Sequence, residues 1–421
     1  MRKAFQGYVQ VGRSKAFRRF WLGMMISRAG DAFTTVALSW VVLDIAGPVQ
    51  LGVVLACFGL PRIVSGPIAG RLLDRSQPRI LLTIDNLARG LLIATVPWLL
   101  WLHHLVVADL CGIAVVSALL SSVTEVAEAA LVPRLVDDEQ LDAANSLLSA
   151  NWELAYIVGP AIAGLIVATI GAPFALLFDA ASFAVMAAFC VSLPPFRPAR
   201  ELAPAIADTP DTGRRNWLGL GLLLRFPAVL VLSFCSFGML FLDGIATVLY
   251  PVYCRSFLHV DAAGYGVLVS VAGIGALLGV VLGVGWFGRL APSLRIGAVI
   301  VCGAPLFGLL RLAPDLPVAA LLLGLAAFAW GPYYVFERTL VQRLVPEDIR
   351  SRLVGARMTI SSLGFPLGSA IGGALLGALG LRTVIPAIAC AYLALGLLPL
   401  LAPALRGLAA DRRLQIRPTA G

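Results

Sequence analysis

The chain has 421 residues, of which 59% are hydrophobic and only 13% are charged, and its mean hydropathy is +0.91. Soluble domains usually carry about 25% charged residues, so this composition excludes a soluble protein and indicates several membrane-spanning helices. The formal charge of +9 does not indicate a nucleic-acid partner, because no basic stretch alternates with aromatic residues as in a nucleic-acid groove.

A bilayer core of about 30 Å requires roughly 20 apolar residues per helix. Segments of that length predict an all-α membrane protein with twelve transmembrane helices, the first one uncleaved, at residues 20–44, 51–73, 79–102, 106–132, 143–170, 173–193, 227–251, 264–288, 294–312, 316–342, 350–379 and 382–404. The polar, proline-rich segment 194–216 is interpreted as a cytoplasmic linker between two six-helix halves, 1–193 and 217–421. Most Lys and Arg residues lie at the two termini, in the linker and in every second turn, which predicts that both termini are cytoplasmic.

Ionisable side chains inside the predicted spans are candidates for function, because a charge at the bilayer centre is costly. In the first span Asp31 lies near the middle, with Arg28 one turn earlier on the same face. A proton or substrate role for this pair competes with a self-neutralised pair of structural value. Arg62 follows a proline in the second span and could face either a cavity or a gate. In the third span Asp85 and Arg89 are four residues apart and are expected to form an intrahelical ion pair.

The turn after the second span, GRLLDRSQPR (70–79), concentrates charge in an otherwise apolar region. Positive-inside topology explains its arginines, Arg71, Arg75 and Arg79, but not Asp74 or Gly70. A carboxylate and guanidinium groups at a helix end can pair in one conformational state and separate in another. The pattern therefore predicts a gate at the cytoplasmic side.

Glu125 and Glu128 share one face of the fourth span, with no basic residue close upstream. Two carboxylates within one helical turn should not both be ionised in a low dielectric, so one is expected to carry a proton. Glu128 has a copy in the second half and Glu125 does not, which makes Glu125 the better candidate for the proton site. Glu153, near the middle of the fifth span, is a further candidate.

The two halves are related by an internal repeat. A shift of 209 residues places LVPRLVDDEQ (131–140) on LVQRLVPEDI (340–349) without a gap. The same shift pairs Glu128 with Glu337 and Arg134 with Arg343, and a shift of 212 pairs Asp31 with Asp243. Two copies that start on the same side predict a pseudo-two-fold axis along the membrane normal. Because each copied glutamate precedes its arginine by six residues, these four residues are predicted to belong to the cytoplasmic gate.

The segment GRLLDRSQPR resembles the cytoplasmic signature between helices two and three of the major facilitator superfamily. Gly70, Asp74, Arg75 and Arg79 fill its main positions, and Pro78 stands where many members have Gly. The copy in the second half, WFGRLAPSLR, is weaker, because Gly288 stands where the carboxylate would fall.

A second resemblance lies in the fifth span. YIVGPAIAG (156–164) is similar to the G-P-x-x-G-G element of antiporter branches, with Gly159, Pro160 and Gly164 matching and Ala163 replacing a Gly. Small residues there allow close helix packing, and proline bends the span. The order of motifs in the first half also resembles the bacterial exporter branch that includes macrolide efflux pumps and the enterobactin exporter.

The resemblance implies a proton-coupled secondary transporter that exports a small amphipathic compound, a drug or a siderophore, by alternating access. A lipid or lysophospholipid transporter, or a facilitative uptake carrier of the same fold, remains an alternative. An intramembrane enzyme is less favoured, because no nucleophile with a base, metal-ligand spacing or cofactor fingerprint occurs in the sequence. The expectation is therefore a monomeric, multi-pass protein of the bacterial inner membrane, with protons and a small molecule as partners and no metal or cofactor.

Overall fold

The computed structural model describes residue 8 and residues 10–194 and 221–406, and every element in these ranges is a helix. The chain forms two compact units. Unit 1 comprises Met1–Pro210 with His259–Ser270, and unit 2 comprises Asp211–Leu258 with Val271–Gly421. The predicted linker 194–216 lies, apart from its first residue, outside the described residues. The prediction of an all-helical protein is confirmed for the described part of the chain.

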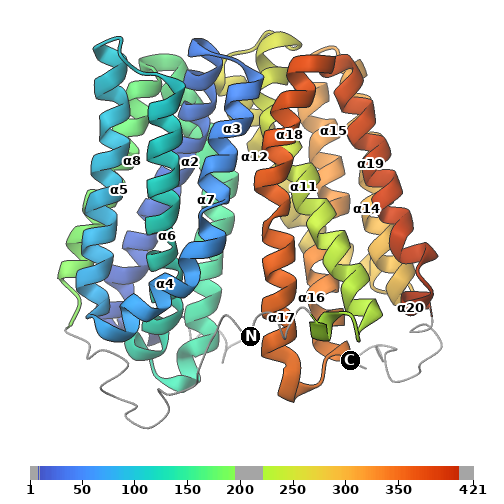
Figure 1. Ribbon diagram of the computed structural model, residues 1–421, viewed down its shortest axis with the longest axis horizontal. Helices are drawn as coiled ribbons and strands as arrows, with labels where there is room; N and C mark the ends of the chain where they lie inside the picture. The colour runs from blue at the N-terminus through green and yellow to red at the C-terminus, as the bar shows by residue number, and fades with distance from the viewer. Residues whose placement is uncertain (1–7, 9, 195–220, 407–421) are drawn as a thin grey trace. The chain divides into compact units, whose positions relative to one another are not determined.

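Unit 1 is a bundle of long helices that run side by side (Figure 1). Its helices are α2 (Lys15–Ile45), α3 (Pro48–Gly59), α4 (Arg62–Arg75), α5 (Pro78–Trp101), α6 (Val107–Leu135), α7 (Leu141–Ile170), α8 (Ala172–Val191) and the first part of α12 (Ala262–Leu278), with the short η1 (Asp138–Gln140). The first long helix, α2, packs against α7 and α8, while α5 packs against α8 and α6 against α3 and α4.

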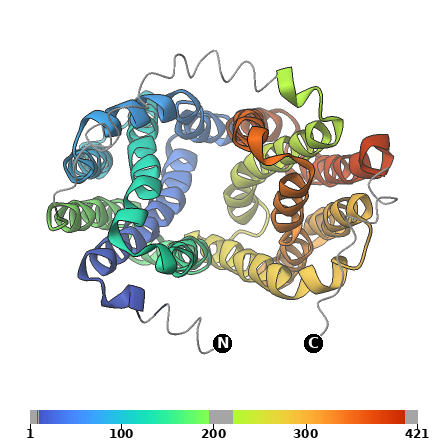
Figure 2. The ribbon, with the colours of Figure 1, turned by 90° about the horizontal axis from the view of Figure 1, so that it is seen from below.

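Unit 2 forms a bundle of its own, seen end-on in Figure 2. Its helices are α11 (Pro227–Ser256), the later part of α12 (Ala262–Leu278), η2 (Gly279–Gly283), α13 (Val284–Phe287), α14 (Pro292–Gly308), η3 (Leu309–Leu312), α15 (Leu316–Trp330), α16 (Tyr333–Leu344), α17 (Glu347–Ser362), α18 (Gly364–Leu379), α19 (Leu381–Leu401) and α20 (Pro403–Arg406). The pairings repeat those of unit 1, because α11 packs against α18 and α19, and α14 packs against α19.

Eleven helices among the described residues are long and apolar enough to cross a membrane. They correspond to the second through twelfth predicted spans. The first predicted span, 20–44, forms α2, which has 31 residues and is long enough to cross. This helix is less apolar than the others because it carries charged side chains, Arg28 and Asp31 among them.

Several predicted spans are interrupted rather than continuous. The second span breaks between α3 and α4 at Leu60 and Pro61, because proline has no N–H to continue the helical ladder. A comparable break separates α15 from α16 at Gly331 and Pro332. These breaks leave α4 and α16 as short helices of 14 and 12 residues.

Small residues hold the first and fifth long helices of each unit together. A Cβ on Gly159 of α7 would lie 2.5 Å from the Cβ of Ala32 on α2. In unit 2 a Cβ on Gly368 of α18 would overlap the backbone carbonyl of Phe241 on α11. Gly159 and Gly368 are the pair that the 209-residue repeat relates. The same close approach therefore occurs at the same place in both copies.

The element YIVGPAIAG lies in α7, with Pro160 inside the helix. A Cβ on Gly164 would overlap the carbonyl of Ala262 at the start of α12, within unit 1. The backbone N–H of Ala161 donates to the hydroxyl of Ser270 at 3.1 Å. This stretch of α7 therefore packs closely on both sides, as its small residues predict.

Candidate functional site

Charged and hydroxyl side chains from α2, α4, α5 and α6 converge inside unit 1. They enclose a cavity of about 20 Å³, room for one water molecule. The lining residues are Met24, Ser27, Arg28, Asp31, Arg62, Arg89, Ser121, Thr124 and Glu125. Three arginines and two carboxylates thus face one small space within a membrane-spanning bundle. We name these residues, with Glu128, the unit 1 charge cluster.

The most buried ion pair of the cluster joins α2 to α6. Arg28 Nη2 lies 3.2 Å from Glu128 Oε2, and the two side chains are only 11% and 19% exposed. The guanidinium also lies over the ring of Trp152 on α7, 3.7 Å from its centroid. Burial, a charge partner and a cation–π contact fix this arginine in one position.

The most accessible pair joins α4 to α6. Arg62 Nη1 lies 3.6 Å from Glu125 Oε1, and the side chains are 44% and 48% exposed. Arg62 is the first residue of α4, directly after the Pro61 break. Glu125 is therefore a half-exposed carboxylate within a predicted membrane span, and its arginine partner lies where α3 and α4 meet.

A third pair joins α2 to α5 and corrects the expected intrahelical pair. Arg89 Nη2 lies 3.2 Å from Asp31 Oδ1, and its guanidinium stacks 4.3 Å above the ring of Phe183. Asp85 instead accepts a hydrogen bond from the hydroxyl of Thr124 on α6 at 2.6 Å. Arginine is long enough to reach a neighbouring helix, so spacing along one helix did not identify its partner.

The two glutamates of α6 also differ from expectation. The sequence suggested two carboxylates without a nearby cation, but each has its own arginine, Arg62 for Glu125 and Arg28 for Glu128. Both arginines come from helices that are distant in sequence. Charge balance therefore does not require a proton on either glutamate in this conformation, and accessibility is what distinguishes Glu125.

A second buried pair lies in unit 2. Glu337 on α16 forms an ion pair with Arg357 on α17, and the glutamate is 1% exposed. Arg357 also donates to the hydroxyl of Ser236 on α11 at 3.2 Å, and this hydroxyl lies 3.2 Å from that of Tyr333. The sequence reasoning missed Arg357, although an arginine inside a predicted span, 350–379, is itself the signal for such a partner.

The structure does not bring the copied glutamates to the arginines that follow them. Glu128 pairs with Arg28 rather than Arg134, and Glu337 pairs with Arg357 rather than Arg343. Six residues correspond to about 600° of helix rotation, so the two side chains point to different sides of the helix. Arg134 lies in the last turn of α6, and Arg343 lines a separate pocket of unit 2 with Arg295.

The signature 70–79 spans the end of α4 and the start of α5. The side chains of Asp74 and Arg75 lie outside the described residues. Gly70 has open space where a Cβ would stand. Arg79 Nη1 donates to the carbonyl of Leu193 at 3.5 Å and so links the start of α5 to the end of α8. The gate role of this signature stays a prediction.

The remaining candidates are Glu153 and Asp243. Glu153 is exposed on α7, directly after the Trp152 that covers Arg28. Asp243 lies within α11, and its carbonyl accepts a hydrogen bond from Thr247 at 2.9 Å. Asp31 accepts the same bond from Thr35 at 2.9 Å. The pair that the repeat relates therefore shares its local geometry, whereas a salt bridge to arginine is found, among the described residues, only for Asp31.

The fold and the charge cluster define an integral membrane protein whose polar groups face one another inside helical bundles, as in membrane transporters. The family model described as "Transmembrane secretion effector", of the major facilitator superfamily, matches residues 11–415, so the chain belongs to this family. The resemblance inferred from residues 70–79 and 156–164 is thereby confirmed.

Curated relatives include exporters. The chain is 28% identical over 399 residues to multidrug efflux pump Tap of Mycolicibacterium fortuitum, covering 90% of this chain and 94% of that protein. It is 28% identical over 255 residues to enterobactin exporter EntS of Escherichia coli, covering 60% and 58%.

Solved transporters share the fold. A bacterial homologue of the iron transporter ferroportin in an inward-facing state matches with a TM-score of 0.70 at 17% identity, covering 94% of this chain and 99% of that one. Nucleoside transporter NupG matches with a TM-score of 0.67 at 12% identity, covering 94% and 98%. The protein is thus a multi-pass membrane transporter of the major facilitator superfamily.

Proposed function

We propose that the protein is a proton-coupled exporter of a small amphipathic compound, a drug or a siderophore, that works by alternating access. The relatives named as a multidrug efflux pump and an enterobactin exporter support the direction and the substrate class. The observation that carries proton coupling is the half-exposed pair of Glu125 and Arg62 inside the charge cluster. A carboxylate that water reaches within a membrane span can exchange protons with the aqueous side.

The proposal includes the arrangement of the whole chain. The helices α2–α8 and α11–α19 would form two six-helix halves, 1–193 and 217–421, related by a pseudo-two-fold axis along the membrane normal. The repeated helix pairings and the matching bonds of Thr35 and Thr247 support this symmetry. Both termini and the linker would be cytoplasmic, and the transporter would act as a monomer in the bacterial inner membrane.

Protonation of Glu125 removes the charge that holds Arg62. The arginine is then free to turn towards a substrate or towards the other carboxylate of the cavity, Asp31, which is 40% exposed. By thermodynamic linkage, a substrate that binds better to one protonation state also favours that state. Glu125 is therefore proposed as the proton carrier, and Arg62 as the side chain whose position changes when Glu125 gains or loses its proton.

The helix that begins at Arg62 provides a path from this pair to the predicted gate. α4 has 14 residues, about 21 Å at 1.5 Å per residue, and its far end carries Asp74 and Arg75. The Pro61 break separates it from α3. Release of Arg62 would thus free one end of a short rigid helix whose other end bears the gate signature, so protonation and gating would be coupled mechanically.

The test is Glu125→Gln, which mimics the protonated carboxyl. The purified variant is reconstituted into proteoliposomes, and transport of the fluorescent cation ethidium is followed with and without an imposed pH gradient. We expect the variant to lose the acceleration by the gradient while retaining ethidium binding, because the exchangeable proton is gone but the cavity remains.

Glu139→Gln is the matched control, because Glu139 is an exposed glutamate of the short helix η1 outside the cluster. Its response to the gradient should equal that of the wild type. An unchanged response of Glu125→Gln would refute Glu125 as the proton carrier and direct the same test to Glu153 and Asp31. Absence of gradient-driven transport of any probe by the wild type would refute proton coupling itself.

A further inference from the structure

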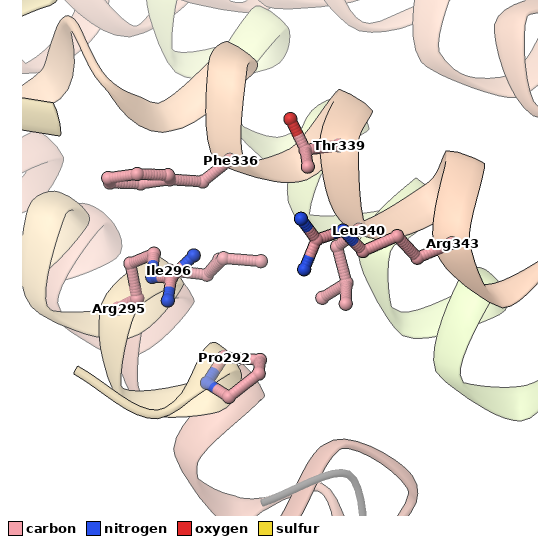
Figure 3. A pocket seen from close by; sticks show the side chains of 7 residues that line it. All are labelled: Pro292, Arg295, Ile296, Phe336, Thr339, Leu340 and Arg343. Atoms are coloured by element: carbon pink, nitrogen blue, oxygen red, sulfur yellow. The ribbon is translucent and has the colours of Figure 1, made fainter. Parts of the chain in front are cut away.

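A basic pocket in unit 2 lies outside the proposed proton site, although one of its residues, Arg343, belongs to the predicted gate. It lies between α14 and α16 and is lined by Pro292, Arg295, Ile296, Phe336, Leu340 and Arg343, together with Thr339 (Figure 3). Figure 3 shows the guanidinium groups of Arg295 and Arg343 turned into the space between the two helices. None of the seven lining residues is acidic. Two like charges facing one space repel each other unless an anion lies between them.

Arg295 is held in place for this role. Its Nη2 donates to the carbonyls of Gly288 at 2.8 Å and Leu290 at 2.9 Å, and its guanidinium lies 4.9 Å from the ring centroid of Phe336. Its Nε is buried and has no hydrogen-bond partner among the described residues. One donor of a fixed guanidinium is therefore left without an acceptor.

The neighbouring polar groups do not supply that acceptor. The hydroxyl of Thr339 donates to the carbonyl of Val335 at 2.8 Å. Glu337, the acidic residue closest in sequence to Phe336, forms its ion pair with Arg357 on α17. Arg343 is exposed and forms no salt bridge with another described residue. Among the side chains that the structure describes, no carboxylate forms a salt bridge with either guanidinium of the pocket.

The surroundings indicate a ligand that is anionic at one end and apolar at the other. The pocket joins the start of α14 to the last turns of α16, at two of the turns predicted to be cytoplasmic, 288–295 and 343–352. Leu294 and Val335, next to Arg295 and Phe336 in sequence, are exposed. Trp286, at the end of the preceding helix, is exposed as well, as is typical of aromatic residues at a membrane interface.

We propose that this pocket binds the phosphate of an anionic phospholipid from the cytoplasmic leaflet. Arginine guanidinium groups match phosphate oxygens in geometry and charge, and basic pockets between transmembrane helices on the cytoplasmic side are suited to lipid headgroups. The exposed apolar side chains beside the pocket accommodate the acyl chains. The site is separate from the charge cluster of unit 1, so it does not depend on the proposed proton carrier.

The test uses the full-length protein in detergent, with bound lipids counted by native mass spectrometry. Phosphatidylglycerol is titrated against phosphatidylcholine, and inorganic phosphate is the soluble arm. We expect one saturable site that prefers phosphatidylglycerol and that inorganic phosphate does not compete for. Arg343→Gln should weaken this binding roughly five- to tenfold, and Arg343→Lys should weaken it less.

Arg338→Gln is the matched control, because Arg338 is an exposed arginine of the same helix that does not line the pocket. It removes the same charge and should leave phosphatidylglycerol binding unchanged. Arg343 is chosen over Arg295 because the hydrogen bonds of Arg295 support the local fold. Equal loss of phosphatidylglycerol binding in Arg343→Gln and Arg338→Gln, or no loss in either variant, would refute the proposed lipid site. Competition by inorganic phosphate would show that the pocket binds free phosphate rather than the phosphate of a lipid headgroup.

Discussion

At the scale of single residues, several ionisable side chains inside the helices have an ion-pair or hydrogen-bond partner. Arg28 and Glu128 satisfy each other, and Asp179 on α8 is hydrogen-bonded by the hydroxyls of Thr34 and Ser182. A buried pair contributes little net stability when intact, but loss of one member leaves an uncompensated charge in a low dielectric. Substitution of one partner alone should therefore destabilise the protein more than substitution of both.

Arg28→Gln should destabilise the protein by about 3 kcal/mol, because Glu128 then stays buried without a cation. The double variant Arg28→Met with Glu128→Met should recover most of this loss, since no charge remains. Thermal unfolding in detergent, followed by tryptophan fluorescence, measures both. Equal destabilisation of the single and double variants would contradict an ion pair at this position and indicate a packing role.

At the scale of helices, close approach between backbones sets the geometry of each unit. In the part of unit 2 that the structure describes, α11 and α18 approach each other through four glycines. A Cβ on Gly364, Gly368 or Gly372 of α18 would meet backbone atoms of α11, and a Cβ on Gly244 of α11 would meet the carbonyl of Phe365. Van der Waals packing rather than hydrophobic burial holds helices together in lipid, and small residues allow it.

Gly368→Ala should destabilise the protein by about 2 kcal/mol or more, because the added methyl group overlaps a backbone carbonyl that cannot move aside. The matched control is Gly355→Ala in α17, where nothing lies within 4 Å of the new Cβ. This change should be neutral or stabilising by up to about 1 kcal/mol, because alanine favours helix over glycine. Thermal unfolding of the two variants side by side provides the measurement, and similar effects of the two would contradict the packing argument.

The sequence allowed the helices to be predicted better than their contacts. Apolar length follows directly from bilayer thickness, so each predicted span corresponds to helix in the structure. Partners such as Arg89 with Asp31 could not be predicted, because spacing along a chain identifies only neighbours on the same helix. The Pro61 break was visible as a proline inside an apolar segment, yet the segment 51–73 was interpreted as one continuous helix.

At the scale of the whole molecule, contacts within unit 1 agree with helices that cross the membrane alternately in opposite directions, because the start of one helix lies beside the end of another. The hydroxyl of Ser14, before α2, donates to the carbonyl of Leu135 at the end of α6 at 3.1 Å. Arg79, at the start of α5, reaches Leu193 after the end of α8. Arg19, in the first turns of α2, donates to the carbonyl of Ser192 at 3.3 Å and so links the two pairs. These positions therefore lie at one end of unit 1, the end where the positive-inside rule predicts the cytoplasm.

Single cysteines introduced into a cysteine-free background test this orientation. His104→Cys, in the exposed turn after α5, should react with a membrane-impermeant maleimide applied to intact cells. Asp138→Cys, in the exposed turn after α6, should react only after the cells are opened. Both sites are exposed, so each is the accessibility control for the other. The reverse pattern would invert the predicted topology.

The two glutamates that the repeat relates, Glu128 and Glu337, obtain their arginines from different helices, so the same glutamate position accepts an arginine from either of two places. Shifting Arg357 back by 209 residues gives Leu148, and shifting Arg28 forward by 212 gives Leu240. The glutamate therefore occupies the same position in both copies, while its arginine comes from a different position in each. An arginine moved from one of these positions to the other should therefore still pair with the glutamate. The double variant Arg28→Leu with Leu148→Arg should give Glu128 an arginine at the position that Arg357 has relative to Glu337. It should unfold in detergent at a higher temperature than Arg28→Leu alone.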